Sequence, residues 1–171
     1  LFLFILSVIY GSLVMGMDAY RRTENFATVQ QQAMTALRDV SQEMANAPRA
    51  SVPTPTVNTV VLASARDGAG KLHYDDQGQV LWQAWVTYYV TGQGLMRSRL
   101  PFTPSATLPT AIPTSSTIRS SGSATHRVVA ATVESLVVNL ATSSADLELV
   151  AANDLWGRTS VQVLDRVWFR Q

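Results

Sequence analysis

The sequence contains no cysteine and few charged residues. The absence of thiols excludes disulfides, cysteine-ligated zinc, iron–sulfur clusters and a cysteine nucleophile, and it leaves oxidising and reducing compartments equally open. Charged residues make up 15% of the 171 residues, well below the ~25% usual for soluble domains. The formal net charge is +1, so no general excess of cations attracts nucleic acid. Nucleic-acid binding would therefore need a local basic patch.

Residues 1–17 contain no charged side chain, and their apolar residues fall on every face of a helix. Such a helix covers about 25 Å, slightly less than the ~30 Å hydrocarbon core of a bilayer. We therefore expect a segment that lies in a membrane or in the core of a filament, and further residues before Leu1, since the chain does not start with Met. The side chains expected in this core are Leu3, Phe4, Leu6, Ile9, Leu13, Val14 and Met17.

A cleavable signal peptide or a buried helix of a soluble protein are the alternatives for this segment. A signal peptide predicts a cleavage site of small residues and a break in the pattern, and neither follows Met17. Instead, an apolar stripe continues at helical spacing, and residues 23–47 contain no Gly or Pro before Pro48 stops the helix. We predict one helix over 1–47, about 70 Å long, with an amphipathic part over 18–47. Its packing stripe is Phe26, Val29, Ala33, Leu37, Val40 and Met44.

The charged residues of the amphipathic part lie off this stripe. A solvated helix face is their simplest interpretation, and pairing between subunits of a polymer is the alternative. The residues concerned are Arg21, Arg22, Glu24, Arg38, Asp39 and Glu43.

After Pro48 the sequence changes to the alternating pattern of strands. We predict a β head over 48–171, with strands at 57–64, in a hairpin over 80–100, and at 127–131, 134–141, 147–152 and 159–169. In the first hairpin strand, one face carries Val80, Trp82, Ala84, Val86, Tyr88 and Val90. Residues 101–125 are rich in Pro, Ser and Thr and nearly free of charge, which predicts a long surface loop. The fold class is α+β, with the long helix packed on an antiparallel sheet.

Few residues suggest chemistry. His73 and His126 are far apart in sequence and lack a ligand at helical spacing, and the chain has no phosphate loop or nucleophile elbow. We therefore expect no enzyme, no metal and no cofactor. The hairpin aromatics with Arg97 and Arg99 could form a nucleic-acid face, but packing aromatics and solvated arginines are the preferred interpretation at this net charge.

The order of these features resembles the type IV pilin superfamily. Residues 34–40 (MTALRDV) are similar to the helix of minor pilins and of J-type pseudopilins of type II secretion systems. The hairpin sequence at 88–90 (YYV), followed by Leu95 and Arg97, and the strand sequence at 133–136 (VESL) are similar to later parts of those proteins. The resemblance implies a pilin-like fold and covers most of the chain except the Pro/Ser/Thr-rich loop.

The resemblance also implies features that are absent here. Family members are cut by a prepilin peptidase ahead of a residue that is usually Phe, and a Glu at the fifth mature position enters the filament core. Ile5 holds the fifth position of this sequence. Either the sequence starts several residues inside the mature protein, which is the interpretation we favour, or the protein is a member without this Glu.

The expected function is a structural subunit of a type IV pilus-like or type II secretion pseudopilus filament. Its expected partners are other copies or related subunits and the assembly machinery. We expect it in the cytoplasmic membrane before assembly and in a periplasmic or extracellular filament afterwards. The alternative is a single-pass membrane-anchored protein whose β head binds a ligand, a partner or DNA. The sequence leaves open whether the subunit is major or minor and which system it serves.

Overall fold

The computed structural model describes residues 1–105, 107–108, 111–154 and 158–169. Two α-helices, α1 (Phe2–Asn46) and α2 (Ser115–Ser120), and a 3-10 turn, η1 (Arg49–Ser51), accompany the strands. The strands are β1 (Thr59–Ser64), β2 (Trp82–Thr91), β3 (Gly94–Ser105), β4 (Thr125–Ala130), β5 (Val133–Leu140), β6 (Ser144–Asn153) and β7 (Thr159–Trp168). The predicted α+β fold is confirmed, with one long helix followed by antiparallel strands.

The strands of the head divide into two antiparallel sheets. One has the order β1-β2-β3-β4 and the other the order β5-β6-β7, so consecutive strands are neighbours within each sheet. The segment between β1 and β2 makes only isolated bridges, which join Arg66 to Leu72 and Tyr74 to Val80. This segment therefore leaves the first sheet as a looped excursion of turns and returns to it at β2.

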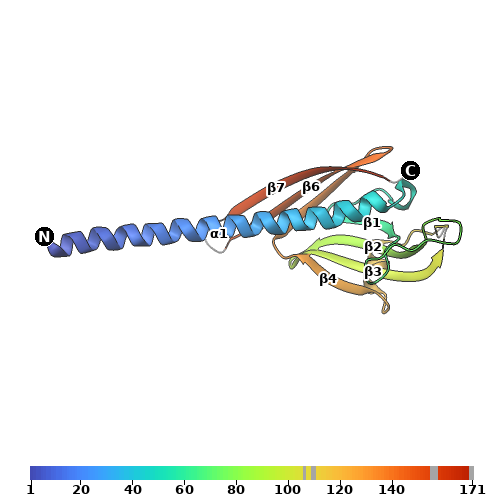
Figure 1. Cartoon of the computed structure of the whole chain (residues 1–171), viewed down its shortest axis with the longest axis horizontal. Coiled ribbons are helices and arrows are strands. Elements are labelled where there is room, and N and C mark those ends of the chain that lie inside the picture. The colour runs from blue at the N-terminus through green and yellow to red at the C-terminus, as the bar shows by residue number, and fades with distance from the viewer. Residues whose placement is uncertain (106, 109–110, 155–157, 170–171) are drawn as a thin grey trace.

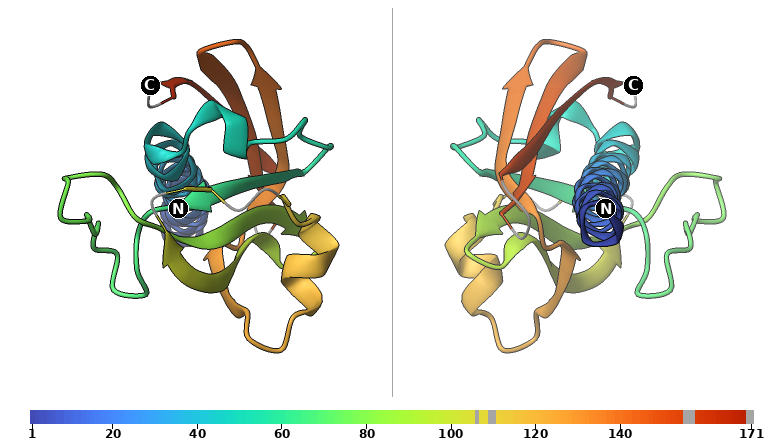
Figure 2. Two further views of the ribbon diagram at one scale, coloured as in Figure 1. Left: turned by 90° about the vertical axis from the view of Figure 1, so that its right-hand side faces the viewer. Right: turned by 90° about the vertical axis from the view of Figure 1, so that its left-hand side faces the viewer.

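The carboxy-terminal half of α1 lies against both sheets, and its amino-terminal half extends beyond the head (Figure 1). In Figure 1, β6 and β7 lie above the helix and β2 and β3 below it, and the end-on views show both sheets along the same flank of the helix (Figure 2). Ala47 is extended, and Pro48 follows it at the end of the helix. Proline restricts the preceding residue to extended backbone, which explains why α1 ends here.

The main core forms where α1 meets both sheets. The sheets contribute apolar side chains such as Leu62, Tyr88 and Leu149. The helix and the residue after it contribute the buried residues Val29, Ala33, Ala36, Leu37, Val40, Met44 and Ala47. Alanines at two of the helix positions allow the sheets to approach the helix backbone closely. One apolar cluster thus joins the helix to both sheets, so neither sheet packs on α1 independently of the other.

A second core covers the opposite face of the first sheet and corrects our prediction for β2. Val80 and Trp82 were expected to share a face with Val86 and Tyr88, but they cluster instead with Trp85. The register of β2 on β3 shifts between Trp82 and Ala84, and an irregularity of this kind moves a side chain to the other face. Both faces of β2 are therefore buried, which a two-residue alternation alone does not reveal.

The predicted surface loop over 101–125 is partly wrong. β3 continues to Ser105, α2 occupies Ser115–Ser120, and β4 begins at Thr125, while residues 106 and 109–110 lie outside the described residues. Thr114 caps α2 by accepting a hydrogen bond from the backbone N–H of Thr117. Ile118 of α2 is fully buried in the second core. This one apolar side chain docks α2 on the sheet. The average composition of the polar segment does not reveal it.

Replacing Ile118 by Ala should destabilise the head by about 2 kcal/mol or more, because it removes the buried side chain that holds α2 on the sheet. Urea unfolding followed by tryptophan fluorescence measures this change. Ile112→Ala is the matched control, since Ile112 lies in the same segment and is 37% exposed, and its effect should stay within about 0.5 kcal/mol. Equal effects of the two substitutions would contradict the docking of α2.

Candidate functional site

The amino-terminal half of α1 is apolar and uncovered. The side chains predicted for a membrane or filament core are all exposed, from 39% for Val14 to 79% for Leu3. α1 is long and apolar enough to cross a membrane, and none of its most apolar window is buried within the chain. An apolar surface of this extent on a protein marks a contact with lipid or with another protein. This segment is the candidate functional site.

The polar groups of this segment are compatible with an apolar environment. The backbone is helical from Phe2 onward, and the N–H of Ile5 donates to the carbonyl oxygen of Leu1. Beyond the first turn, the backbone N–H and C=O groups are therefore paired within the helix, as lipid requires. The Ser7 hydroxyl donates to the carbonyl oxygen of Phe4 at 2.8 Å. The first charged side chain, Asp18, lies 4.0 Å from Arg21. Beyond its first turn, the segment can therefore leave water without losing a backbone hydrogen bond.

The packing stripe on the other half of α1 lies against the head, with one exception. Val29, Ala33, Leu37, Val40 and Met44 are buried, but Phe26 is 47% exposed. Steps of three and four residues continue the buried face from Val29 back to Asn25, whose amide donates to the Thr159 hydroxyl at 3.5 Å. Thr159 begins β7, so the head ends beside this turn of the helix. Phe26 lies on the adjacent face and adds to the uncovered apolar surface.

Two of the charged residues of α1, for which a solvated face was preferred and pairing between subunits was the alternative, form ion pairs within the chain. Asp39 lies 2.7 Å from Arg127 of β4, and Glu43 lies 3.2 Å from Arg97 of β3. The side chain of Glu43 also accepts a hydrogen bond from the Ser64 hydroxyl. These contacts form because the first sheet lies beside the helix and presents arginines to it. Sequence reasoning missed them, although Glu43 is three residues from Val40 and thus close to the buried stripe.

The other charges of α1 remain at the surface. Arg22, Glu24 and Arg38 are exposed, and Arg21 is partly covered near Asp18. Arg38 borders a groove with Met34 of the same helix and Leu164 of β7. Pairing of these four residues between subunits stays a prediction.

Tyr88 connects Asp39 of α1 to the first sheet. Its side chain is fully buried, and its hydroxyl donates to an Asp39 carboxylate oxygen at 3.1 Å. Burial raises the pKa of Tyr88 well above its usual value, and the negative charges of Glu43 and Asp39 raise it further. The hydroxyl is therefore protonated and remains a hydrogen-bond donor across the physiological pH range.

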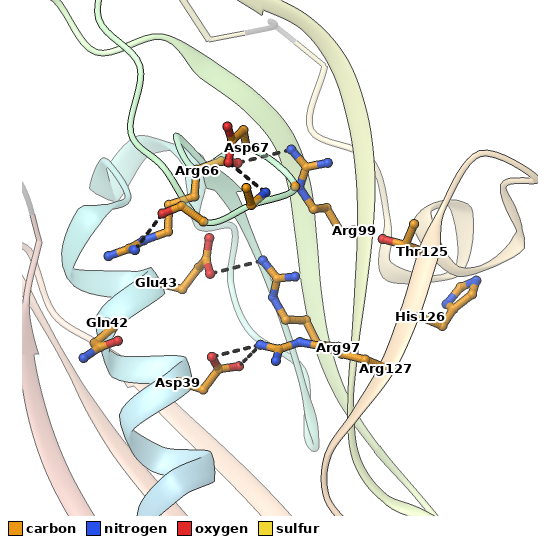
Figure 3. A pocket seen from close by; sticks show the side chains of 13 residues that line it. Asp39, Gln42, Glu43, Arg66, Asp67, Arg97, Arg99, Thr125, His126 and Arg127 are labelled. Carbon is orange, nitrogen blue, oxygen red and sulfur yellow. Dashed lines mark hydrogen bonds and ion pairs between the residues drawn. The ribbon is translucent and has the colours of Figure 1, made fainter.

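A pocket of about 570 Å³ opens beside these ion pairs (Figure 3). It is bounded by α1, by the turn at 66–70 and by β3 and β4. The side chains that border it are mostly charged: Asp39, Gln42, Glu43, Arg66, Asp67, Arg97, Arg99, Thr125, His126 and Arg127. Arg97 and Arg99 were predicted to be solvated, but neither is fully exposed, and the Arg97 side chain is only 14% exposed.

Both histidines have local partners. His73 Nε2 lies 2.8 Å from an Asp67 carboxylate oxygen, and His126 Nδ1 lies 2.6 Å from the Ser98 hydroxyl. No group of three or more metal-ligating side chains occurs within the described residues. The contacts of both rings are thus explained by the local turn and by the sheet.

Comparison of the chain with known protein families, with curated proteins and with solved structures found no match. The fold itself is compatible with a pilin-like arrangement, since a long apolar helix precedes and packs on antiparallel sheets. Function must therefore be argued from the geometry of this chain.

Replacing Glu43 by Gln should destabilise the head by about 3 kcal/mol, because the buried Arg97 cation loses its counter-charge. Denaturant unfolding of the full chain in detergent measures the change. Asp146→Asn is the matched control, as it breaks an ion pair with Arg166 whose two side chains are more than half exposed, and such pairs contribute at most about 1 kcal/mol. A Glu43→Gln variant as stable as this control would contradict the structural role of the pair.

Replacing His73 by Ala should raise the pKa of Asp67. The hydrogen bond from His73, followed by the backbone N–H of Lys71, lowers this pKa from 3.8 to about 2. Any stability that the Asp67 carboxylate contributes is present above its unfolded pKa and is lost as the pH falls through about 2. Loss of His73 moves the pH at which folded Asp67 is protonated towards 3.8. Carbon-13 NMR of the carboxyl group measures the titration, with His126→Ala as the control; an unchanged Asp67 titration would contradict the assignment.

Proposed function

We propose that this chain is a structural subunit of a type IV pilus-like or type II secretion pseudopilus filament. The observation that carries the proposal is the division of a single helix. The carboxy-terminal half of α1 is buried in the head, while its amino-terminal half is apolar on every face and uncovered. The segment is therefore suited to an environment outside its own chain, and one continuous helix joins it to the head.

The same apolar surface suits two environments in succession. In the cytoplasmic membrane, lipid covers the side chains and the helix satisfies its own backbone. In a filament, the helices of other copies or of related subunits replace the lipid. Each Å² of apolar surface that they keep from water stabilises the assembly by about 25 cal/mol. Gly11 and Gly16 have no other chain atoms within 4 Å of an added Cβ, so they offer positions for close helix approach. Assembly machinery would move the subunit between the two environments.

The contacts of the head with α1 explain how such a filament would be ordered. Asp39 and Glu43 pair with strands of the first sheet, and the main core joins α1 to both sheets. Bundling the helices therefore also sets the positions of the heads on the filament exterior, periplasmic or extracellular. Head-to-tail contacts that do not close into a ring generate a fibre.

Replacing Val14 by Arg should reduce incorporation into filaments at least tenfold, while the head remains folded. A charge at the centre of a bilayer or helix bundle costs about 2.5 kcal/mol or more, which is well over tenfold in an equilibrium. Electron microscopy and quantitative immunoblots of filaments sheared from the producing cells measure incorporation.

Gln30→Arg is the matched control, because Gln30 is an exposed residue of the same helix beside the head. It should assemble as the unsubstituted chain does. Normal assembly of the Val14→Arg variant would sink the filament proposal.

The second candidate is a membrane-anchored protein whose head binds a ligand. The charged pocket beside α1 favours it, since a pocket of about 570 Å³ falls within the range of small-molecule sites. Fractionation of the cells distinguishes the two candidates. A membrane-anchored binding protein would stay in the membrane fraction and be absent from every sheared filament.

A further inference from the structure

The head has two open sheet edges, those of β4 and β7. Each of these strands is the last in its sheet, and no strand among the described residues pairs with its other edge. The edges of β1 and β5 meet at Asn58, whose backbone N–H and side-chain oxygen bond the carbonyl oxygen and the N–H of Leu136 at 3.1 and 3.0 Å. β4 and β7 lie on opposite sides of the head (Figure 1). The head therefore ends in an unpaired strand on each side.

Both open edges carry exposed apolar side chains. Residues 125–128 of β4 and 164–166 of β7 are exposed without interruption. Within these runs, Val128 is 51% exposed and Leu164 is 70% exposed. A groove of about 540 Å³ opens between β7 and α1, bordered by Leu164 and Met34. Neither strand contains Pro or Lys, which commonly prevent an open edge from pairing with another chain.

β7 runs in the same direction as α1. Thr159, at the start of β7, accepts a hydrogen bond from the Asn25 amide at 3.5 Å. Further along both elements, the Asp165 carboxylate accepts from the Ser41 hydroxyl at 2.6 Å. Residue numbers therefore rise together along the strand and the helix.

β4 runs in the opposite direction to α1. Arg127 of β4 lies 2.7 Å from Asp39. Thr132, which follows the end of β4, donates from its hydroxyl to the Gln32 side-chain oxygen at 3.0 Å. Residue numbers therefore rise along the strand while they fall along the helix.

These directions decide how the open edges of two copies can pair. A membrane or a filament holds the α1 helices of all copies in one direction, so this step rests on the proposed function. β7 of one copy and β4 of another are then antiparallel, whereas two β7 strands or two β4 strands would be parallel. Antiparallel pairs are slightly more stable per residue than parallel ones.

We propose that β7 of one copy pairs with β4 of a neighbouring copy as antiparallel strands. The contact joins two different surfaces of the same chain. Each pair of copies therefore leaves one β4 edge and one β7 edge open, and further copies can add in the same way. The pairing would join the heads of successive subunits side by side.

The side chains of the two strands indicate a register for this pair. Asp165 and Arg127 each contact α1 of their own chain, so both lie on the same face of the joined sheet. Placing them opposite each other pairs a carboxylate with a guanidinium and sets Leu164 opposite Val128 on the other face. Opposite charges and apolar side chains are favourable cross-strand pairs. Arg127 can keep its contact with Asp39, because a guanidinium has five N–H donors.

The test is disulfide cross-linking between copies in filaments of the producing cells. The chain has no cysteine, so Leu164→Cys and Val128→Cys introduce the only thiols. Directly opposite residues of antiparallel strands lie about 4.5–5.5 Å apart, which a disulfide can span. After oxidation with copper–phenanthroline, the double variant should give a ladder of dimers, trimers and larger species on a non-reducing gel. Each single variant should stay monomeric, because the contact joins two different edges.

Val137→Cys combined with Val128→Cys is the matched control. Val137 lies in the same row of the sheet as Leu164 and is 36% exposed, but it belongs to β5, two strands away from the open edge. This variant should stay monomeric. An equal ladder from this control, dimers from Leu164→Cys alone, or filaments of the double variant that give no ladder would each overturn the pairing.

A second pair of substitutions decides the matter if the first impairs assembly. Arg166→Cys with His126→Cys is the next pair on the same face in this register, and both residues are exposed. It should give the same ladder. Filaments that contain the unsubstituted chain, together with no ladder from either cysteine pair, contradict the pairing alone. Absence of the unsubstituted chain from all filaments contradicts the proposed function, and the pairing with it.

Discussion

The packing of one half of α1 against both sheets is the constraint on which the rest of the structure depends. Val29, Val40 and Met44 are fully buried there, in a single core shared by the helix and the two sheets. The buried face of the helix ends near Asn25, which contacts Thr159 at the start of β7. The preceding turns remain uncovered and apolar. This uncovered apolar surface is compatible with a membrane or with other helices, and the proposed function rests on it.

The polar contacts around this core determine how the head is oriented on the helix. Glu43 is 8% exposed and Arg97 is 14% exposed, so breaking one partner would leave a charge with little access to water. A buried ion pair gives little net stability, but it disfavours any rotation of α1 that separates its partners. The pair lies one turn from Asp39, which contacts both Tyr88 and Arg127. The same row of contacts forms one wall of the pocket, so the orientation of the helix and the shape of the pocket depend on shared residues.

Much of the fold was predictable from the sequence, and the exceptions have physical causes. The long helix and the later strands could be predicted from the periodicity of apolar residues, because a helix or strand with one covered face repeats them at a regular spacing. The division into two sheets, the irregularity at Trp82 and the docking of Ile118 depend on contacts between distant segments, which local period does not encode. The uncovered segment of the candidate site was predictable from the absence of charge. The pairing of Glu43 and the position of Arg99 were not, because both depend on how the sheet lies beside α1.

The measurement that tests the central claim most directly is the solvent accessibility of α1 in lipid vesicles. The chain has no cysteine, so spin labels can be attached one at a time at Leu6, Ile9 and Leu13, with Gln30 as the reference. Electron paramagnetic resonance then compares collisions with oxygen, which partitions into lipid, and with a water-soluble nickel reagent. The account predicts high oxygen and low nickel accessibility at the first three positions and the reverse at Gln30. Equal nickel accessibility at all four positions would contradict it.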